Sequence, residues 1–302
     1  MCVLPLTGPL APNLASVECY TIFSSDGPVA NVGITNVLGD VGTNNGTVTG
    51  FNPLLVVGII HTVPDPSTIL AASDLLNAYN YLNALPYDIE LLFPALFGHN
   101  LVLTPHTYIM NGAVTFTDTT FLNAEGNPNA VFVIQVKGAF ATSTYSNVVL
   151  MNGTRAENVY WMIDGAVSIN DFSLFNGTIV CNNAAMDLTN GVEIHGRALT
   201  TTGALSTFAI NAFMPPGCGG TSAPLIITQP TDQSTCDGGS VSFTVSATGT
   251  GLTYQWRKGI VNLIDGGNIS GATTATLTIN PATILDVASN YNVVVSGTFL
   301  PS

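Results

Sequence analysis

The sequence has few charged residues and very few basic ones. Only 8% of its 302 residues are charged, and Lys and Arg together number five against 18 Asp and Glu, which gives a formal net charge of −13. Nucleic-acid binding depends on clusters of basic residues, so no nucleic-acid partner is expected. The chain also lacks a run of about 18 apolar residues, and its acidic balance disfavours anionic membrane surfaces. We therefore expect no membrane insertion.

The sequence also lacks the spacing of cysteine and histidine that a metal site needs. Neither a Cys-x-x-Cys pair nor a Cys/His cluster occurs among these residues, which are Cys2, Cys19, Cys181, Cys218, Cys236, His61, His99, His106 and His195. We predict no metal and no cofactor. The odd number of cysteines leaves at least one thiol free or paired with another chain. The composition, with the domain combination described below, predicts a secreted protein.

No pattern of catalytic residues is present. The chain has no G-x-S-x-G motif around a nucleophilic serine. Asp118, Asp171 and Asp187 lie on repeat strands or their corners, and paired carboxylates there would suit a polysaccharide-cleaving enzyme. No basic residue lies near them in sequence to stabilise a carbanion, and Asp is favoured in turns. We therefore interpret them as turn residues, interpret Arg197 as a structural ion-pair or carbonyl-binding residue, and predict that the chain is not an enzyme.

The sequence does contain a weak internal repeat. Six-residue segments begin at positions 112, 138, 165, 184 and 203, and the first reads Gly112-Ala113-Val114-Thr115-Phe116-Thr117. In each segment the third and fifth residues are mostly apolar, whereas the fourth and sixth are mostly small or polar. This period of two predicts strands with one face inward and the other outward.

Two more sets of apolar strands lie between the repeats. One set includes residues 148–150, 173–175 and 192–194, and the other includes residues 131–134, 159–162 and 178–180. Three strands per repeat, stacked repeat on repeat, would bury a continuous apolar interior that no single repeat could close alone. The spacing therefore predicts a mainly β fold, a three-sided β-solenoid (β-helix).

One segment has helical spacing instead. Apolar residues recur at positions 69, 72, 75, 76, 79 and 82. Asp65 can cap the N-terminus and Pro66 can occupy the first helical position. We expect one long α-helix over about 66–83, which flanks the solenoid.

The amino-acid composition changes beyond residue 213. Residues 214–224 are rich in Gly and Pro and predict a linker. Short β patterns follow in 225–302, with Cys236, then Trp256 and then Tyr291 at spacings that suggest an immunoglobulin-like sandwich. Trp256 would be its core tryptophan and Tyr291 would lie near a tyrosine corner. Because the chain stops just after the strand at 291–295, we expect this domain to lack its last strand.

Residues 14–213 resemble the microbial ice-binding-protein family, whose fold is a discontinuous β-solenoid with a flanking helix. Six motifs in the family's order carry this resemblance, at residues 38–42, 74–79, 101–105, 126–135, 152–161 and 196–199. The last reads Gly196-Arg197-Ala198-Leu199. The second domain is similar to immunoglobulin-like repeats of secreted bacterial surface proteins. Residues 1–13 would then form an N-terminal extension.

The resemblance implies adsorption to ice through a flat solenoid face. In the family this face often carries a T-A/G-x-T/N pattern at the corner after the first strand of a repeat, and the corners here begin at residues 117, 143, 170 and 189. The expected ice-binding residues are Thr115, Thr117, Thr119, Thr120, Ser143, Ser146, Ser168, Asn170, Ser173 and Thr189.

Two functions follow from the sequence. The first is a secreted, non-catalytic ice-binding protein with an ice surface as its partner. The second is a structural subunit of an extracellular filament or adhesin, polymerising by strand complementation of the incomplete sandwich. The high mean hydropathy of +0.42 and the expected unpaired strand edge motivate this alternative.

Overall fold

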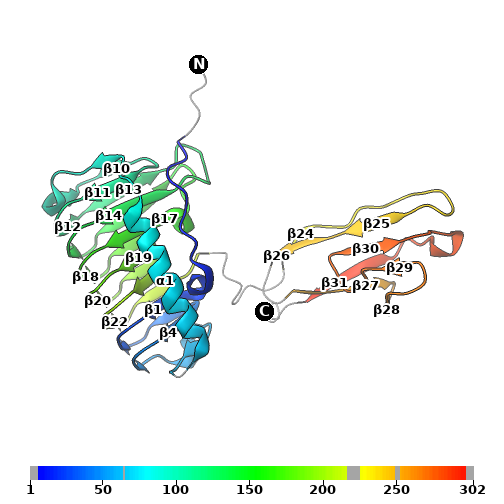
Figure 1. Ribbon diagram of the computed structural model, residues 1–302, viewed down its shortest axis with the longest axis horizontal. Coiled ribbons are helices and arrows are strands. Elements are labelled where there is room, and N and C mark those ends of the chain that lie inside the picture. Colours follow the sequence, from blue (N-terminus) through cyan, green and yellow to red (C-terminus); the bar gives the residue numbers. More distant parts are fainter. Residues whose placement is uncertain (1–5, 64, 216–224, 249–251, 297–302) are drawn as a thin grey trace, which may run out of the picture. The chain divides into compact units, whose positions relative to one another are not determined.

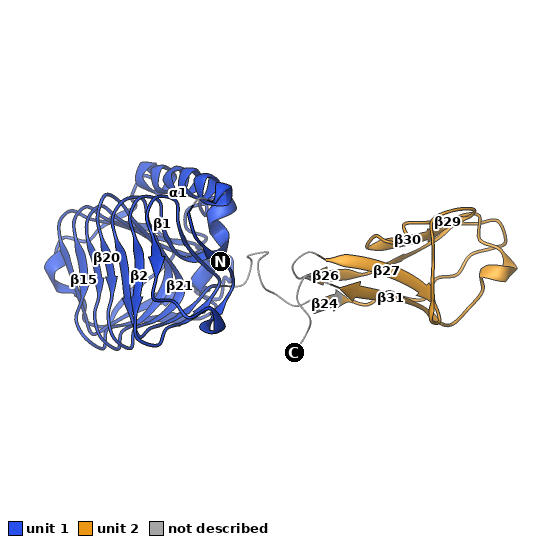
Figure 2. Cartoon of the chain, turned by 90° about the horizontal axis from the view of Figure 1, so that it is seen from below, with its two compact units in different colours: residues 1–218 blue, residues 219–302 orange. Residues whose placement is uncertain are grey.

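The computed structural model describes residues 6–63, 65–215, 225–248 and 252–296. The chain divides into two compact units, residues 1–218 and 219–302, which are coloured separately in Figure 2. Cys2, Cys218 and residues 216–224 of the expected linker lie outside the described residues.

Unit 1 consists of parallel strands in two sheets and one long helix, which confirms the mainly β prediction. The eight-stranded sheet contains, in spatial order, β5 (Val48–Thr49), β2 (Val29–Val32), β22 (Leu205–Phe208), β20 (Met186–Leu188), β18 (Val167–Ile169), β15 (Phe140–Thr142), β12 (Val114–Thr117) and β9 (Phe97–Gly98).

The larger sheet has 15 strands. Its main path runs through β6 (Val56–Val57), β3 (Asn36–Leu38), β23 (Asn211–Phe213), β21 (Glu193–Thr200), β19 (Leu174–Cys181), β17 (Val159–Ile163), β14 (Phe132–Val136), β11 (Thr107–Met110) and β8 (Ile89–Glu90). The remaining strands are β1 (Tyr20–Ser24), β4 (Asp40–Thr43), β7 (Ile60–His61), β10 (Leu101–Leu103), β13 (Thr119–Asn123) and β16 (Asn147–Met151). Short 3₁₀ segments cover Ala15–Cys19, Pro53–Leu55, Pro94–Leu96 and Ala156–Asn158.

The spatial order of the strands departs from the chain order at the N-terminus. Strand β1 pairs with β21 on one side and with β4 on the other, and β2 lies between β22 and β5 in the same way. The first strands are therefore inserted between the last strands and the second set. The helix α1 (Pro66–Ala84) connects β7 to β8 at the opposite end of the sheet path, and Figure 1 shows it running across the successive strands.

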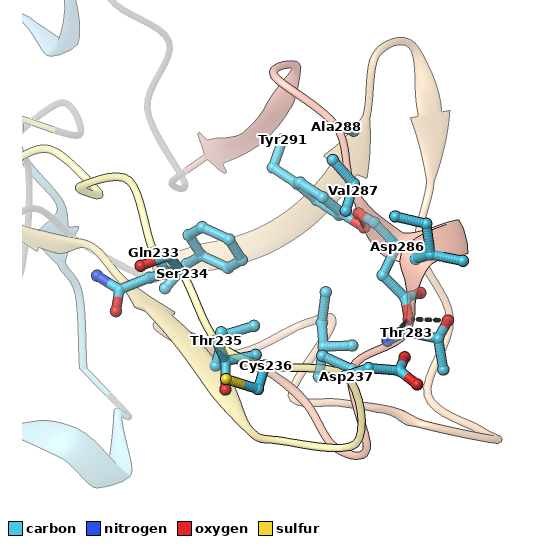
Figure 3. Close-up of a pocket in the computed structure, with 15 residues that line it drawn as sticks. Gln233, Ser234, Thr235, Cys236, Asp237, Thr283, Asp286, Val287, Ala288 and Tyr291 are labelled. Atoms are coloured by element: carbon cyan, nitrogen blue, oxygen red, sulfur yellow. Dashed lines mark hydrogen bonds between the residues drawn. The ribbon is translucent and has the colours of Figure 1, made fainter.

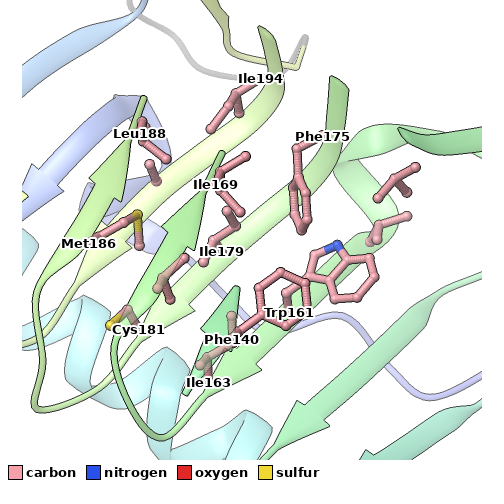
Figure 4. Close-up of a cluster of buried hydrophobic side chains, with 14 of the residues drawn as sticks. Phe140, Trp161, Ile163, Ile169, Phe175, Ile179, Cys181, Met186, Leu188 and Ile194 are labelled. Carbon is pink, nitrogen blue, oxygen red and sulfur yellow. The ribbon is translucent and has the colours of Figure 1, made fainter. Parts of the chain in front are cut away.

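The alternation of apolar and polar residues determines the interior. In β12 the side chains of Val114 and Phe116 are buried, whereas Thr115 between them is exposed. Trp161 is fully buried, and its ring centroid lies 5.8 Å from that of Phe140 and 5.0 Å from that of Phe175 (Figure 4). Aromatic pairs at these distances add to the stabilisation from buried apolar area.

The predicted helix is present, and its buried face combines large and small residues. Asp65 accepts a hydrogen bond from the backbone N–H of Ser67 (2.9 Å) and caps the helix. The buried residues of α1, which pack on the 15-stranded sheet, are Thr68, Ala71, Leu75, Ala78, Tyr79 and Leu82. Ile69 and Leu76, part of the predicted apolar stripe, are 64% and 49% exposed. The inner face thus keeps Leu75, Tyr79 and Leu82 of the predicted stripe and extends toward Ala71 and Ala78. No helix in the described ranges is long and apolar enough to cross a membrane.

Unit 2 is antiparallel. Its strands are β24 (Leu225–Thr228) with β26 (Ser246–Thr248), then β25 (Val241–Thr244), β30 (Thr276–Ile279) and β29 (Ile269–Ser270), and finally β28 (Val261–Asn262), β27 (Thr253–Lys258) and β31 (Tyr291–Ser296). A 3₁₀ segment covers Ile284–Asp286. Trp256 is fully buried in its core, and the indole N–H donates to the carbonyl oxygen of Thr274 (2.9 Å).

Three cysteines fall within the described ranges. Cys19 is disulfide-bonded, whereas Cys181 and Cys236 are free. Cys181 is buried in unit 1, and burial raises the pKa of its thiol to about 11. Cys236 is exposed in unit 2.

Candidate functional site

The outward side of the eight-stranded sheet, which we call the small-residue face, carries aligned columns of side chains. Its central column joins residues that are direct partners on neighbouring strands, namely Thr115, Ala141, Ser168, Asp187, Ser206, Ala30 and Thr49. All seven side chains are exposed or half-buried. Figure 2 shows β15, β20 and β2 of this sheet running along one another.

A second column consists of alanine over five consecutive strands. The backbone hydrogen bonds Val114–Ala139, Phe140–Ala166, Val167–Ala185 and Met186–Ala204 keep these residues aligned, and the exposed members are Ala113, Ala139, Ala166, Ala185 and Ala204. A third column lies on the other side of the central one and contains Thr117, Ser143, Asn170, Thr189, Phe208 and Val32. Its first four members are half-buried and polar.

The columns form a regular two-dimensional array. Neighbouring strands are about 4.8 Å apart, and alternate residues along a strand are about 6.6 Å apart. Small methyl, hydroxyl and amide groups occupy most positions. Asp187 is the one charged residue among the described members of the three columns, and its carboxylate accepts a hydrogen bond from Ser206.

The other sides of unit 1 are less uniform. Helix α1 covers one side, where Tyr160, Met162 and Leu199 are buried against it. Another surface of unit 1, on the paired strands β21 and β23, mixes charged and large apolar groups. There His195 contacts Glu193 (2.6 Å, Nε2 to Oε1) and Phe213 remains 38% exposed.

The structure brings six of the ten predicted ice-binding residues onto the small-residue face. They are Thr115, Thr117, Ser143, Ser168, Asn170 and Thr189. Thr119 is half-buried at the start of β13, in the next sheet. The prediction of exposure is wrong for Thr120, Ser146 and Ser173, which are at most 1% exposed.

Two of these buried hydroxyl groups, those of Ser146 and Ser173, hydrogen-bond to the backbone at the strand corners. The Ser146 hydroxyl donates to the carbonyl oxygen of Phe116 (3.2 Å), and the Ser173 hydroxyl donates to that of Ser143 (3.1 Å). Each of these serines follows a residue with a left-handed backbone conformation, Tyr145 or Phe172. This conformation turns the next side chain inward, which a two-residue period does not predict.

The three carboxylates of the catalytic hypothesis, Asp118, Asp171 and Asp187, have different local contacts. The carbonyl oxygen of Asp171 accepts a hydrogen bond from the backbone N–H of Tyr145 (2.9 Å). Asp118 adopts a left-handed conformation at a corner and contacts His99 (2.8 Å, Oδ2 to Nδ1), whereas Asp187 lies on β20. No cluster of metal-ligating side chains occurs in the part of the chain that the structure describes. The structural interpretation of Arg197 is confirmed. Its Nε donates to the carbonyl oxygen of Glu18 (2.7 Å), and burial lowers the pKa of its guanidinium.

Unit 2 contains a hollow of about 430 Å³ between β25 and β31 (Figure 3). Phe243 and Tyr291 stack on one side of it, with ring centroids 5.4 Å apart. The backbone N–H and hydroxyl of Thr283 both donate to Asp286 (2.8 Å each), so these polar groups serve the local turn. The array on unit 1 is therefore the better candidate for a functional surface.

Most of this array was not predicted from the sequence. The alanine column lies at the second position of each repeat, and the Gly-Ala pairs at residues 112–113, 138–139 and 165–166 were its signal. Ala30 and Thr49 could not be placed without knowledge that β2 and β5 extend the same sheet.

Comparison with known proteins identifies the family. The model of the ice-binding-like family matches residues 23–211. The chain belongs to the ice-binding-like family. An ice-binding protein of Nostoc is 34% identical over 180 residues, which cover 59% of this chain and 65% of that protein. An ice-binding protein of Colwellia is 31% identical over 212 residues, covering 65% and 81% respectively.

Solved structures of ice-binding proteins share the fold. The crystal structure of an ice-binding protein from an Antarctic bacterium of the Flavobacteriaceae matches with a TM-score of 0.71 and 56% identity, covering 72% of this chain. A second, from an Antarctic biological consortium, matches with a TM-score of 0.65 and 28% identity. The chain spans 65% of the Nostoc protein and 52% of the Flavobacteriaceae protein. The alternative of a filament subunit or adhesin finds no support in these comparisons.

Proposed function

We propose that the chain adsorbs to ice through the small-residue face of unit 1. The observation that carries this proposal is the alignment of three columns of mostly small side chains over consecutive parallel strands. The proposed contact residues include the predicted Thr115, Thr117, Ser143, Ser168, Asn170 and Thr189 together with the alanine column, and Thr119 lies at the edge.

The mechanism needs no reacting group. Methyl groups at fixed spacing restrict the water layer next to them, while neighbouring hydroxyl and amide groups hydrogen-bond to it. A rigid sheet holds these groups in place before binding, so little conformational entropy is lost on adsorption. Each group contributes little free energy of adsorption, and the total comes from the many groups that repeat along the columns.

Bulky substitutions on this face test the proposal. Replacing Ala166 and Ala185 by Tyr would place two large side chains above the array. Both positions are exposed, so the new side chains would displace no packed neighbour. We expect the double variant A166Y/A185Y to lose at least nine-tenths of the thermal hysteresis of the parent chain. The matched control is N80Y, which adds the same group at an exposed position of α1.

The thermal hysteresis of the two variants distinguishes the small-residue face from the other surfaces of unit 1. Full activity in N80Y with loss in A166Y/A185Y supports the proposal, provided that both variants keep the parent circular dichroism spectrum. Undiminished hysteresis in A166Y/A185Y would remove the small-residue face as the ice-binding surface.

We also propose the finer architecture that the sequence predicts. Residues 14–213 would form a three-sided β-solenoid, preceded by an extension (1–13) and followed by a linker (214–224). Residues 225–302 would form an immunoglobulin-like domain. The buried Trp256 and the hydrogen bond from the Tyr291 hydroxyl to the carbonyl oxygen of Asp286 (2.9 Å), a tyrosine corner, support this. We propose further that the protein is secreted and non-catalytic and acts outside the cell, where ice forms.

A further inference from the structure

Two exposed aromatic rings stack on one corner of unit 1. Tyr145 is 66% exposed and Phe172 is 47% exposed. Their ring centroids are 5.2 Å apart with an interplanar angle of 17°. They lie on neighbouring connections that join the eight-stranded sheet to the 15-stranded sheet.

The corners that carry these rings are longer than the one before them. Phe116 pairs with Thr142 and Thr119 pairs with Asn147. Along the shorter connection, two residues lie between Phe116 and Thr119. Along the next connection, four residues lie between Thr142 and Asn147. Tyr145 is one of the four residues of this longer connection, and the following corner has the same length and carries Phe172.

The backbone at both aromatic residues favours glycine instead. Tyr145 and Phe172 have φ angles of 59° and 58°, and the equivalent residue of the next corner is Gly191, with φ of 69°. A left-handed conformation is unfavourable for bulky side chains. Both rings also project into solvent, so they gain little burial in return. Two strained, exposed aromatic residues where glycine fits point to a function outside the fold.

One ring face of the stack is open. Phe172 lies against the backbone of Gly191, because a Cβ on Gly191 would lie 2.5 Å from its ring. Its other face meets Tyr145. The outer face of Tyr145 is therefore directed toward the preceding corner, which holds Asp118. The Tyr145 hydroxyl forms no hydrogen bond with the described residues.

Polar groups lie on the preceding corner, which is joined to this one by a hydrogen bond from the backbone N–H of Asn147 to the carbonyl oxygen of Asp118 (2.8 Å). Asp118 and His99 contact each other (2.8 Å), and their side chains are 62% and 55% exposed. The amide of Asn147 lies beside Tyr145 and donates to its carbonyl oxygen (3.4 Å). A carboxylate accepts two or more hydrogen bonds, and an amide both donates and accepts, so together they can bind hydroxyl groups of a ligand.

We propose that this corner binds a pyranose ring of a neutral polysaccharide. The weakly positive C–H groups on one face of the sugar would meet the electron-rich face of Tyr145. Sugar hydroxyls at the rim of the ring would donate to Asp118 and exchange hydrogen bonds with Asn147 and His99. The net charge of −13 disfavours an anionic polymer. The site would attach the protein to a carbohydrate surface and is independent of the ice proposal.

The test measures binding of neutral oligosaccharides to the full chain. Cellohexaose, maltohexaose and free glucose would be titrated by isothermal calorimetry, with hexaguluronate as the anionic comparison. We expect at least one neutral hexasaccharide to bind, with at least tenfold weaker binding by the variant Y145G/F172G and severalfold weaker binding by D118N. Glucose binding as tightly as a hexasaccharide would assign the site to free sugar, and weaker glucose binding would assign it to the polymer.

The glycine substitutions also separate function from structure. If the rings serve a ligand, Y145G/F172G unfolds within about 3 °C of the parent chain, because the strain it removes offsets the stacking it loses. Tyr87, which is 52% exposed, provides the control Y87A, whose binding should equal that of the parent. Absence of neutral oligosaccharide binding, or undiminished binding by Y145G/F172G, would overturn the proposal. A large fall in unfolding temperature without any change in binding would also overturn it.

Discussion

His61 connects the end of β7 to the start of the helix, and its protonation should stabilise unit 1. Its Nδ1 lies 2.6 Å from Asp65 and its Nε2 lies 3.3 Å from Asp40, while its side chain is only 10% exposed. Hydrogen bonding to Asp40 and Asp65 raises the pKa of His61 although burial opposes this. Hydrogen bonds from His61 and then Ser67 lower the pKa of Asp65 from 3.8 to about 2.

The magnitude follows from the Asp65 pKa. A change from 3.8 to about 2 corresponds to about 2.5 kcal/mol, at about 1.4 kcal/mol per pH unit. Part of this belongs to Ser67, and solvent screens a carboxylate whose side chain is 27% exposed. The share of His61 is therefore about 1–2 kcal/mol. We expect H61Q to unfold about 2–8 °C below the parent chain near pH 5.5, for a unit of this size.

The pH dependence has a definite sign. The contribution of His61 is complete below the histidine pKa of the unfolded chain, and it is lost as the pH rises through the raised pKa of the folded state. The contribution of Asp65 is present above its unfolded pKa and is lost as the pH falls toward 2. The difference between the parent chain and H61Q should therefore be largest between about pH 4 and pH 6.5.

Thermal unfolding of the parent chain and H61Q from pH 4 to pH 9 measures this difference. H195Q is the matched control, because His195 also lies 2.6 Å from a carboxylate, but both side chains are more than 40% exposed. We expect H195Q to differ from the parent by less than about 0.5 kcal/mol. A difference for H61Q that is constant from pH 5 to pH 9 would refute the reasoning.

Three further predictions concern other parts of unit 1. Replacing Asp187 by Thr should raise thermal hysteresis, because it removes a hydrated charge from the central column; equal or lower hysteresis would contradict this. Replacing Gly196 by Ala should cost about 3 kcal/mol by chemical denaturation, because its Cβ would lie 1.8 Å from the carbonyl oxygen of Gly177. G126A, which meets no atom within 4 Å, should cost only about 1 kcal/mol for its left-handed backbone. The Cys181 thiol, with its pKa raised to about 11 by burial, should react with a thiol reagent only after unfolding. Comparison with C181A identifies its signal, and fast reaction of Cys181 in the native chain would show that the site opens.

The alternation of side chains was predictable, but the order of the strands was not. Val114 and Phe116 point inward around Thr115 because a strand has a period of two, which the sequence displays directly. The insertion of β1 between β21 and β4 joins residues nearly 180 positions apart, for instance Ile22 and Ala198, and no local pattern encodes it. Nothing in the spacing of the repeats distinguishes this order from a simple sequential stack.

The candidate site was predictable along the strands and at the first residue of each corner, but not farther into the corners. Ser168 and Thr115 follow the strand period and are on the small-residue face. Ser146 follows Tyr145, whose left-handed conformation changes the direction of the chain, so its hydroxyl is directed inward to the backbone. The helix and its buried Leu75, Tyr79 and Leu82 were predictable from the apolar spacing. The burial of Ala71 and the exposure of Ile69 were not.

Adsorption to a single ice crystal tests the central claim most directly. The chain would be labelled with a fluorophore at the exposed Cys236 of unit 2, and a hemisphere of single-crystal ice would be grown in its presence. If the small-residue face binds ice, the parent chain and N80Y are taken up on defined planes of the ice crystal, whereas A166Y/A185Y is excluded from the ice. Exclusion of the parent chain, or equal uptake of A166Y/A185Y, would contradict the claim that this face binds ice.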